Sequence, residues 1–179
     1  MRALVLVGPR GCGKTTIGTA LAHDLGWPFV DADRVLEQRA GRPIPRIFAD
    51  DGEGAFRDRE EAILGDLLAT PGPWVLATGG GAVLREANRK ALVASPTTVV
   101  YLHASPAVLA ARLAADAGGR PSLTGKPVDQ EVAEILAVRD PLYRAVAARI
   151  VEVDRPLAEI VADLRTEMSK QGEGEKGRR

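Results

Sequence analysis

Short apolar runs alternate along the chain with longer stretches in which apolar residues recur every three or four positions. The run from Ala3 to Val7 is apolar throughout, as is typical of a strand buried on both faces of a parallel sheet. Between Lys14 and Leu25 the apolar residues recur every four positions, and Gly26 follows, which predicts a helix that ends at this glycine. The chain therefore opens with a strand, a glycine-rich loop and a helix.

The same alternation continues toward the C-terminus and predicts four more strands. These strands are expected at residues 29–30, 74–77, 97–102 and 149–153. Helices are expected after residue 33 to about 39, and at 43–49, 54–68, 85–94, 105–113, 130–146 and 156–168. Pro141 lies inside one of them and predicts a kink or break there. Five strands that alternate with helices predict an α/β fold, a five-stranded parallel sheet with helices on both faces.

One domain is expected to fill most of the chain. A length of 179 residues with 45% apolar residues suits a single soluble core. We expect this domain to span residues 1–168. The segment 116–129 is rich in glycine and proline, which predicts a mobile loop within the domain. Residues 169–179 are polar and cannot bury a face, which predicts a disordered tail.

Charge and cysteine content exclude several classes of protein. Lys plus Arg and Asp plus Glu each number 24, so no overall field attracts nucleic acid or an anionic membrane. Cys12 is the only cysteine and there are two histidines, which excludes a disulfide scaffold and a zinc module. The first apolar run is too short for a signal peptide or a membrane span, so we expect a cytoplasmic protein.

The strongest chemical signal is the pattern G-x-x-x-x-G-K-T at residues 8–15, between the first predicted strand and helix. Its glycines let backbone N–H groups surround phosphate oxygens, and the helix that follows adds the positive end of its dipole. Lys14 can reach the β and γ phosphates and the Thr15 hydroxyl can bind Mg²⁺. A GTPase is disfavoured because no Asn-Lys-x-Asp segment is present. The pattern alone indicates phosphate binding, for which we expect Gly11, Cys12, Gly13, Lys14, Thr15 and Thr16, with the Cys12 side chain as a small filler.

Two more groups of residues directly follow predicted strands. Asp31 and Asp33 suit a Mg²⁺ water shell and a substrate hydroxyl, although either one could instead cap the next helix, and Asp33 is well placed to do so. Thr78–Gly81 ends in three glycines, which indicate close backbone approach to a ligand, with a flexible turn as the alternative. The carboxyl ends of parallel strands meet at one edge of a sheet, so we expect these groups to converge there.

Together these residues resemble the shikimate kinase family, from residue 4 to about 164. The segments that carry the resemblance are Gly8–Thr15, Phe29–Asp33, Ile47–Glu53 with Phe56-Arg57, Gly79–Val83, Arg120-Pro121 and Arg139–Tyr143. The resemblance implies a P-loop NTPase fold of the nucleoside-monophosphate-kinase type, with the loop at about 116–129 as a mobile lid. It also implies transfer of the ATP γ-phosphoryl group to the 3-hydroxyl of shikimate, in the biosynthesis of aromatic amino acids.

The resemblance further implies a role for each site residue. Lys14, Asp33 and Arg120 are expected to be catalytic, with Arg120 closing over the phosphates as part of the lid. Arg57 and Arg139 are expected to pair with the shikimate carboxylate, which a guanidinium fork matches in charge and shape. The full sets are Asp33, Arg57, Gly79, Gly80, Gly81 and Arg139 for shikimate, Arg112, Arg120, Arg155 and Pro156 beside the phosphate loop for ATP, and Thr15 and Asp31 for Mg²⁺.

The expected partners are therefore ATP and shikimate, with Mg²⁺ as cofactor, and we expect a monomer without nucleic-acid or membrane partners. A related kinase for another hydroxylated acid, such as gluconate, is the first alternative, since a phosphate loop, a lid and arginines would serve any carboxylated polyol. A nucleoside-monophosphate kinase fits less well, because an acidic pair lies where a second phosphate would sit. A nucleotide-binding module without turnover is disfavoured because Lys14, Thr15, Asp31, Asp33 and Arg120 occur together.

Overall fold

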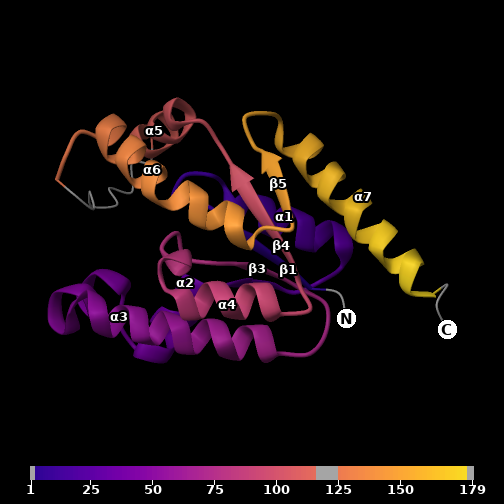
Figure 1. Ribbon diagram of the computed structural model, residues 1–179, viewed down its shortest axis with the longest axis horizontal. Helices are drawn as coiled ribbons and strands as arrows, with labels where there is room; N and C mark the ends of the chain where they lie inside the picture. The colour runs from indigo at the N-terminus through magenta and orange to yellow at the C-terminus, as the bar shows by residue number, and fades with distance from the viewer. Residues whose placement is uncertain (1–2, 116–124, 177–179) are drawn as a thin grey trace.

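A single parallel sheet of five strands forms the centre of the molecule (Figure 1). The computed structural model describes residues 3–115 and 125–176. The strands are β1 (Ala3–Val7), β2 (Phe29–Asp31), β3 (Trp74–Ala77), β4 (Thr98–His103) and β5 (Arg149–Glu152). They lie side by side in the order β2-β3-β1-β4-β5, and every neighbouring pair is parallel. The predicted fold class is therefore confirmed.

The helices begin and end close to the predicted positions. They are α1 (Lys14–Leu25), α2 (Ala32–Ala40), α3 (Ile44–Ala69), α4 (Glu86–Ala94), α5 (Pro106–Ala115), α6 (Val128–Val146) and α7 (Leu157–Lys176), with a 3₁₀ helix η1 (Ala82–Leu84) that the sequence pattern did not predict. Ser105 accepts a hydrogen bond from the amide of Val108 at 3.4 Å, as an N-cap of α5 does. Within residues 3–115 and 125–176, no helix is long and apolar enough to cross a membrane.

Three helices differ from the prediction in continuity or length. The two stretches expected at 43–49 and 54–68 are joined in α3, which bends at Gly52, where φ is 81° and ψ is 172°. No break occurs in α6 at Pro141, because its neighbours on both sides are fixed to the core: Asp140 accepts a hydrogen bond from Tyr101, and Tyr143 is buried. The last helix continues to Lys176, beyond the predicted end at 168.

Alternate residues of the central strand face two separate hydrophobic cores. Leu4 and Leu6 pack in the core that α1 and α7 cover, whereas Val5 and Val7 pack in the core that includes residues of α3, α4 and the end of α6. In Figure 1, α7 lies on one side of the sheet and α3 and α4 lie on the other. Because both faces are covered, every residue of β1 is buried, which explains its uninterrupted apolar run.

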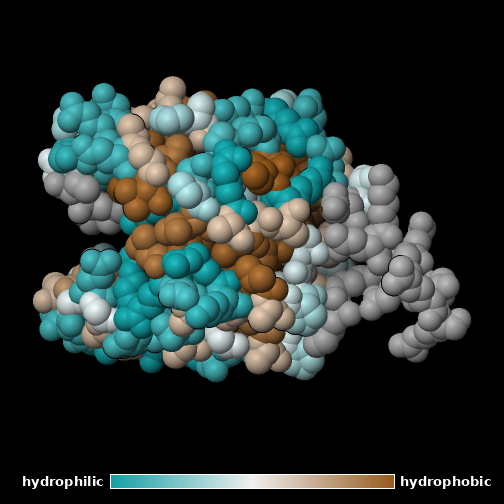
Figure 2. Space-filling view, viewed as in Figure 1, coloured by the Kyte–Doolittle hydropathy of each residue, from teal (hydrophilic) through white to brown (hydrophobic). Residues whose placement is uncertain are grey.

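A third and smaller hydrophobic cluster holds α2 and α3 together. It consists of Leu36, Ile47, Phe56 and Ile63 and contains no residue of the sheet. The rings of Phe48 and Phe56 lie 4.5 Å apart at the edge of this cluster. Helices α2 and α3 form one arm of the molecule, and helices α5 and α6 form another. Figure 2 shows that the surface is hollowed between these two arms. The segment 116–124, which carries Arg120, lies outside the described residues.

Replacing Gly18 by alanine is expected to destabilise the fold even though alanine favours helices. A Cβ at this position of α1 would lie 2.5 Å from Cε2 of Phe29 and 3.1 Å from Cδ1 of Leu6. The forced movement should lower the free energy of unfolding by about 1–2 kcal/mol after the gain in helix propensity. Gly65 on α3 has no heavy atom within 4 Å of such a Cβ, so Gly65→Ala should instead stabilise by up to about 1 kcal/mol.

Urea unfolding followed by circular dichroism measures both free energies. Equal unfolding midpoints for Gly18→Ala and Gly65→Ala would show that the close approach of α1 to the sheet does not restrict residue size at Gly18.

Candidate active site

The loop between β1 and α1 is closed on itself by the side chain of Lys14. Its Nζ donates to the carbonyl oxygens of Gly8 at 2.7 Å and Pro9 at 2.9 Å. Gly13 precedes the helix in the left-handed conformation, with no side chain capping the first turn. The first N–H groups of α1 are therefore left for an anion, and an ammonium group lies beside them. The Cys12 side chain is fully buried in the core, as expected of a filler.

Two oxygen-bearing side chains meet at the start of α1 and α2. The Thr15 hydroxyl donates to Oδ2 of Asp31 at 3.0 Å, and Oδ1 of Asp31 accepts from the amides of Asp33 at 3.1 Å and Arg34 at 3.4 Å. Asp31 is therefore the residue that caps α2, and the expectation that Asp33 suits this role is wrong. The reason is that β2 extends to Asp31, whose extended backbone places its carboxylate over the helix N-terminus.

The three glycines after β3 form a turn around which the other groups crowd. A Cβ at Gly79 would lie 2.7 Å from Oδ1 of Asp33 and 2.7 Å from Oε1 of Glu60. At Gly81 it would lie 2.3 Å from Nη1 of Arg57. A Cβ at Gly80 would be 3.4 Å from the amide nitrogen of Arg10 in the phosphate loop. The predicted convergence of the strand ends is thus present, and the carboxylates and the guanidinium contact bare backbone.

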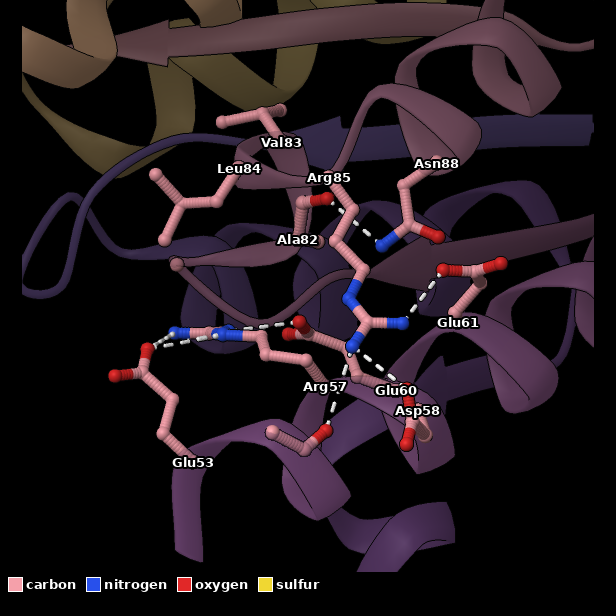
Figure 3. A network of polar contacts seen from close by, with 12 residues as sticks. Glu53, Arg57, Asp58, Glu60, Glu61, Ala82, Val83, Leu84, Arg85 and Asn88 are labelled. Atoms are coloured by element: carbon pink, nitrogen blue, oxygen red, sulfur yellow. Dashed lines mark hydrogen bonds and ion pairs between the residues drawn. The ribbon is translucent and has the colours of Figure 1, made fainter.

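Arg57 is held on α3 by two glutamates of the same helix (Figure 3). Its Nη1 donates to Oε2 of Glu60 at 2.7 Å, while Nε and Nη2 lie 3.3 and 3.2 Å from Oε1 of Glu53. Glu60 is only 6% exposed, and its Oε1 has no hydrogen-bond partner among the described residues. Glu60 was not among the predicted site residues, although its i, i+3 spacing from Arg57 on a predicted helix was a usable signal.

Two residues of α6 reach the glycine turn from the opposite side. Arg139 donates from Nη1 to the carbonyl oxygen of Gly80 at 3.2 Å, and the Tyr143 hydroxyl donates to the same oxygen at 2.5 Å. Between them, burial alone would raise the pKa of Asp140, but hydrogen bonds from Arg144 and Tyr101 hold that pKa below its ordinary value. The charged Asp140 therefore ties this turn of α6 to β4 beside Arg139.

Side chains of α4 and the residue before it hold η1, which directly follows the glycine turn. Asn88 donates to the carbonyl oxygen of Ala82 at 2.9 Å. Nη1 of Arg89 donates to the carbonyl oxygens of Val83 at 2.7 Å and Leu84 at 2.8 Å. Arg85 reaches back to α3, where it pairs with Asp58 at 2.6 Å and Glu61 at 2.9 Å (Figure 3). The glycine turn is therefore held at Gly80 by α6 and followed by a segment that α4 and α3 hold.

A second group of predicted residues lies on the other side of the phosphate loop. Arg112 of α5 donates to the carbonyl oxygens of Gly11 at 3.4 Å and Val153 at 2.9 Å. It thus links the phosphate loop to the segment after β5, where Arg155 and Pro156 precede α7. Arg155 is paired with Asp163, and this hydrogen bond lowers the pKa of that carboxyl group.

The structure thus brings most of the predicted residues into two adjoining groups. Asp33, Arg57, Arg139 and the glycine turn lie together on one side of the phosphate loop, and Arg112 lies on the other. Arg120 lies outside the described residues, so its placement stays a prediction.

A comparison with protein families finds that residues 10–169 match the family model described as shikimate kinase. Among curated proteins, a shikimate kinase of Pseudomonas fluorescens (strain Pf0-1) is 50% identical over 165 residues, which cover 92% of this chain and 94% of that protein. A shikimate kinase of Pseudomonas syringae pv. syringae (strain B728a) is 48% identical with the same coverage.

Solved structures give the same result for the fold. Shikimate kinase from Acinetobacter baumannii in complex with shikimate superposes with a TM-score of 0.83 at 37% identity, over 97% of this chain and 94% of that one. A gluconokinase from Sinorhizobium meliloti superposes less well, with a TM-score of 0.63 at 26% identity, over 96% of this chain and 94% of that one.

Lys14→Met is expected to remove at least nine-tenths of phosphoryl transfer and to leave the fold intact, because the ammonium group makes polar contacts within the loop, with the carbonyl oxygens of Gly8 and Pro9 and the sulfur of Cys12, and fills no space between apolar side chains. A coupled assay of ATP consumption and a circular dichroism spectrum measure the two effects. Lys90→Met, at an exposed lysine of α4, is the control and should keep full activity. If Lys14→Met kept more than about a tenth of the activity, equivalent to a loss below about 1.4 kcal/mol, Lys14 would not lie at the transferred phosphate.

Proposed function

This chain belongs to the shikimate kinase family, and we propose that it transfers the γ-phosphoryl group of ATP to the 3-hydroxyl of shikimate. The observation that carries the proposal is the meeting of Asp33, Arg57 and Arg139 at one glycine turn beside a phosphate-binding loop. Shikimate has one carboxylate and several ring hydroxyls. The site offers the guanidinium groups of Arg57 and Arg139 for the carboxylate of shikimate, and the carboxylate of Asp33 for its hydroxyls.

On the acceptor side, Arg57 and Arg139 would bind the shikimate carboxylate. Each guanidinium is already oriented, Arg57 by two glutamates and Arg139 by the Gly80 carbonyl, so little side-chain entropy is lost on binding. Asp33 would accept a hydrogen bond from the hydroxyl that attacks and orient it toward the phosphate. Backbone N–H groups of Gly79–Gly81 would donate hydrogen bonds to shikimate, which can approach them closely because these residues have no side chains.

On the nucleotide side, the loop amides and Lys14 would hold the β and γ phosphates. The Thr15 and Asp31 oxygens lie 3.0 Å apart and suit Mg²⁺, which binds few protein oxygens and keeps several waters. When bound, this ion would neutralise charge on the phosphates. Arg112, Arg155 and Pro156 would flank the adenine.

Beyond the described residues, Arg120 would close over the phosphates with the segment at about 116–129. We also propose that the enzyme acts as a monomer in the cytoplasm.

A panel of acceptors tests the substrate directly. ATP consumption by the purified chain with Mg²⁺ should require shikimate, and gluconate at the same concentration should not replace it, because the relatives named shikimate kinase match this chain better than the gluconokinase does. Equal or faster turnover with gluconate would contradict the proposal. A rate of ATP consumption that neither acid changes would favour a nucleotide-binding protein of another kind.

Arg57→Ala and Arg139→Ala should weaken shikimate binding by tens of fold or more and leave ATP binding nearly unchanged. Losing one partner of a desolvated charge pair costs about 2–5 kcal/mol. Titration calorimetry with each ligand separates the two affinities. Arg39→Ala, at an arginine of α2 that pairs with Asp66 on the surface, serves as the matched control. Unchanged shikimate affinity in both site variants would move the carboxylate site elsewhere.

A further inference from the structure

We propose that Tyr143 is a positioning residue for shikimate, because its hydroxyl fixes the Gly80–Gly81 peptide so that the Gly81 N–H faces the acceptor. The proposal rests on the proposed function and deepens it. It assigns the acceptor site a residue that touches no reacting atom and acts only through the backbone of the glycine turn.

Tyr143 is held rigidly in a position from which it can act on the turn. Its side chain is fully buried on α6, and its ring stacks on that of Tyr101 in β4, with ring centroids 5.0 Å apart and an angle of 28°. The hydroxyl lies 2.5 Å from the carbonyl oxygen of Gly80. Burial raises the pKa of the Tyr143 phenol above its ordinary value, so the hydroxyl keeps its proton at neutral pH and donates it to this oxygen.

Because a peptide bond is planar, the direction of the Gly80 carbonyl also determines the direction of the Gly81 N–H. In a trans peptide the C=O and the N–H point in opposite directions within one plane, and every peptide bond described here is trans. A Gly80 carbonyl turned toward α6 therefore turns the Gly81 N–H away from α6. Gly81 also borders Arg57, whose Nη1 lies 2.3 Å from where a Cβ of Gly81 would be. The N–H thus points away from α6 at a residue that borders Arg57, one of the two arginines proposed to bind the carboxylate.

Arg139 shares the Gly80 carbonyl, and this explains why a second donor is useful. Its Nη1 lies 3.2 Å from the same oxygen, yet its guanidinium is also needed for the acceptor. While Tyr143 holds the carbonyl, Arg139 can turn its N–H groups to the carboxylate without releasing the peptide. In Tyr143→Phe, Arg139 is the donor left to this oxygen, so the guanidinium is drawn from the acceptor and the peptide loses its fixed plane.

The variant Tyr143→Phe tests the proposal, because it keeps the stacked ring and removes only the hydroxyl. The Kd for shikimate should rise threefold or more, with the Kd for ATP within twofold of the wild-type value. Thr166→Val is the matched control, since it likewise removes one side-chain hydroxyl, which on α7 donates to the carbonyl oxygen of Ala162 in the same helix. Shikimate binding by this control should stay within twofold of wild type.

A rise below threefold in Tyr143→Phe, an equal rise in Thr166→Val, or an equal loss of ATP affinity would each overturn the proposal, because a merely structural hydroxyl would give one of these results. Wild-type protein that does not bind shikimate would overturn the proposed function itself, which is a separate outcome.

A second measurement needs no variant. With glycine labelled at ¹³C′ and ¹⁵N, an HNCO spectrum shows only peptide bonds between two glycines, which are those after residues 79, 80 and 118. The Gly81 amide should move on addition of shikimate and not on addition of an ATP analogue alone, and a Gly81 signal that ignores shikimate would contradict the proposed orientation. This result decides the question if Tyr143→Phe does not fold.

Discussion

Bare backbone at three consecutive positions is the constraint on which the arrangement of this site depends. The carboxylates of Asp33 and Glu60, the guanidinium of Arg57 and the phosphate loop all approach Gly79–Gly81 so closely that most of the space a side chain would need is already filled. Three glycines lose more conformational entropy on folding than other residues would. The hydrogen bonds from α4 and α6 to carbonyl oxygens of the turn and of η1 offset part of that loss and leave the amides in defined positions.

The sequence was sufficient for the strands, for most helices and for the meeting of the strand ends. These features follow from the spacing of apolar residues and from the alternation of strands and helices along the chain. An uninterrupted apolar run such as Ala3–Val7, for example, fits a sheet that is covered on both faces. The cap of α2 was assigned less well, since the choice between Asp31 and Asp33 depends on a single residue at the end of β2. Spacing along a chain does not resolve element ends at that precision.

Buried polar partners were the part of the site that the sequence supplied least, although the i, i+3 spacing of Glu60 from Arg57 pointed to one of them. Glu60 and Tyr143 act across elements, and their contacts depend on how α3 and α6 pack against a turn that lies far from either in the chain. Tyr143 ends the segment Arg139–Tyr143 that carries the family resemblance, but the segment by itself gives the tyrosine no role. A glutamate on a helix is usually solvated and a tyrosine usually fills a core, so what these two side chains contact becomes visible only in three dimensions.

The small cluster between α2 and α3 has a consequence for motion. Leu36, Ile47, Phe56 and Ile63 form a core of their own, separate from the two cores against the sheet. Regions with few buried contacts open at lower free energy than the global fold, and they do so as cooperative units. Arg57 and Glu60 lie on α3 beside this core, whereas Lys14 and Thr15 belong to the helix that packs on the sheet. We therefore expect α2 and the first turns of α3, which this cluster holds, to open locally while α1 and the phosphate loop keep their shape.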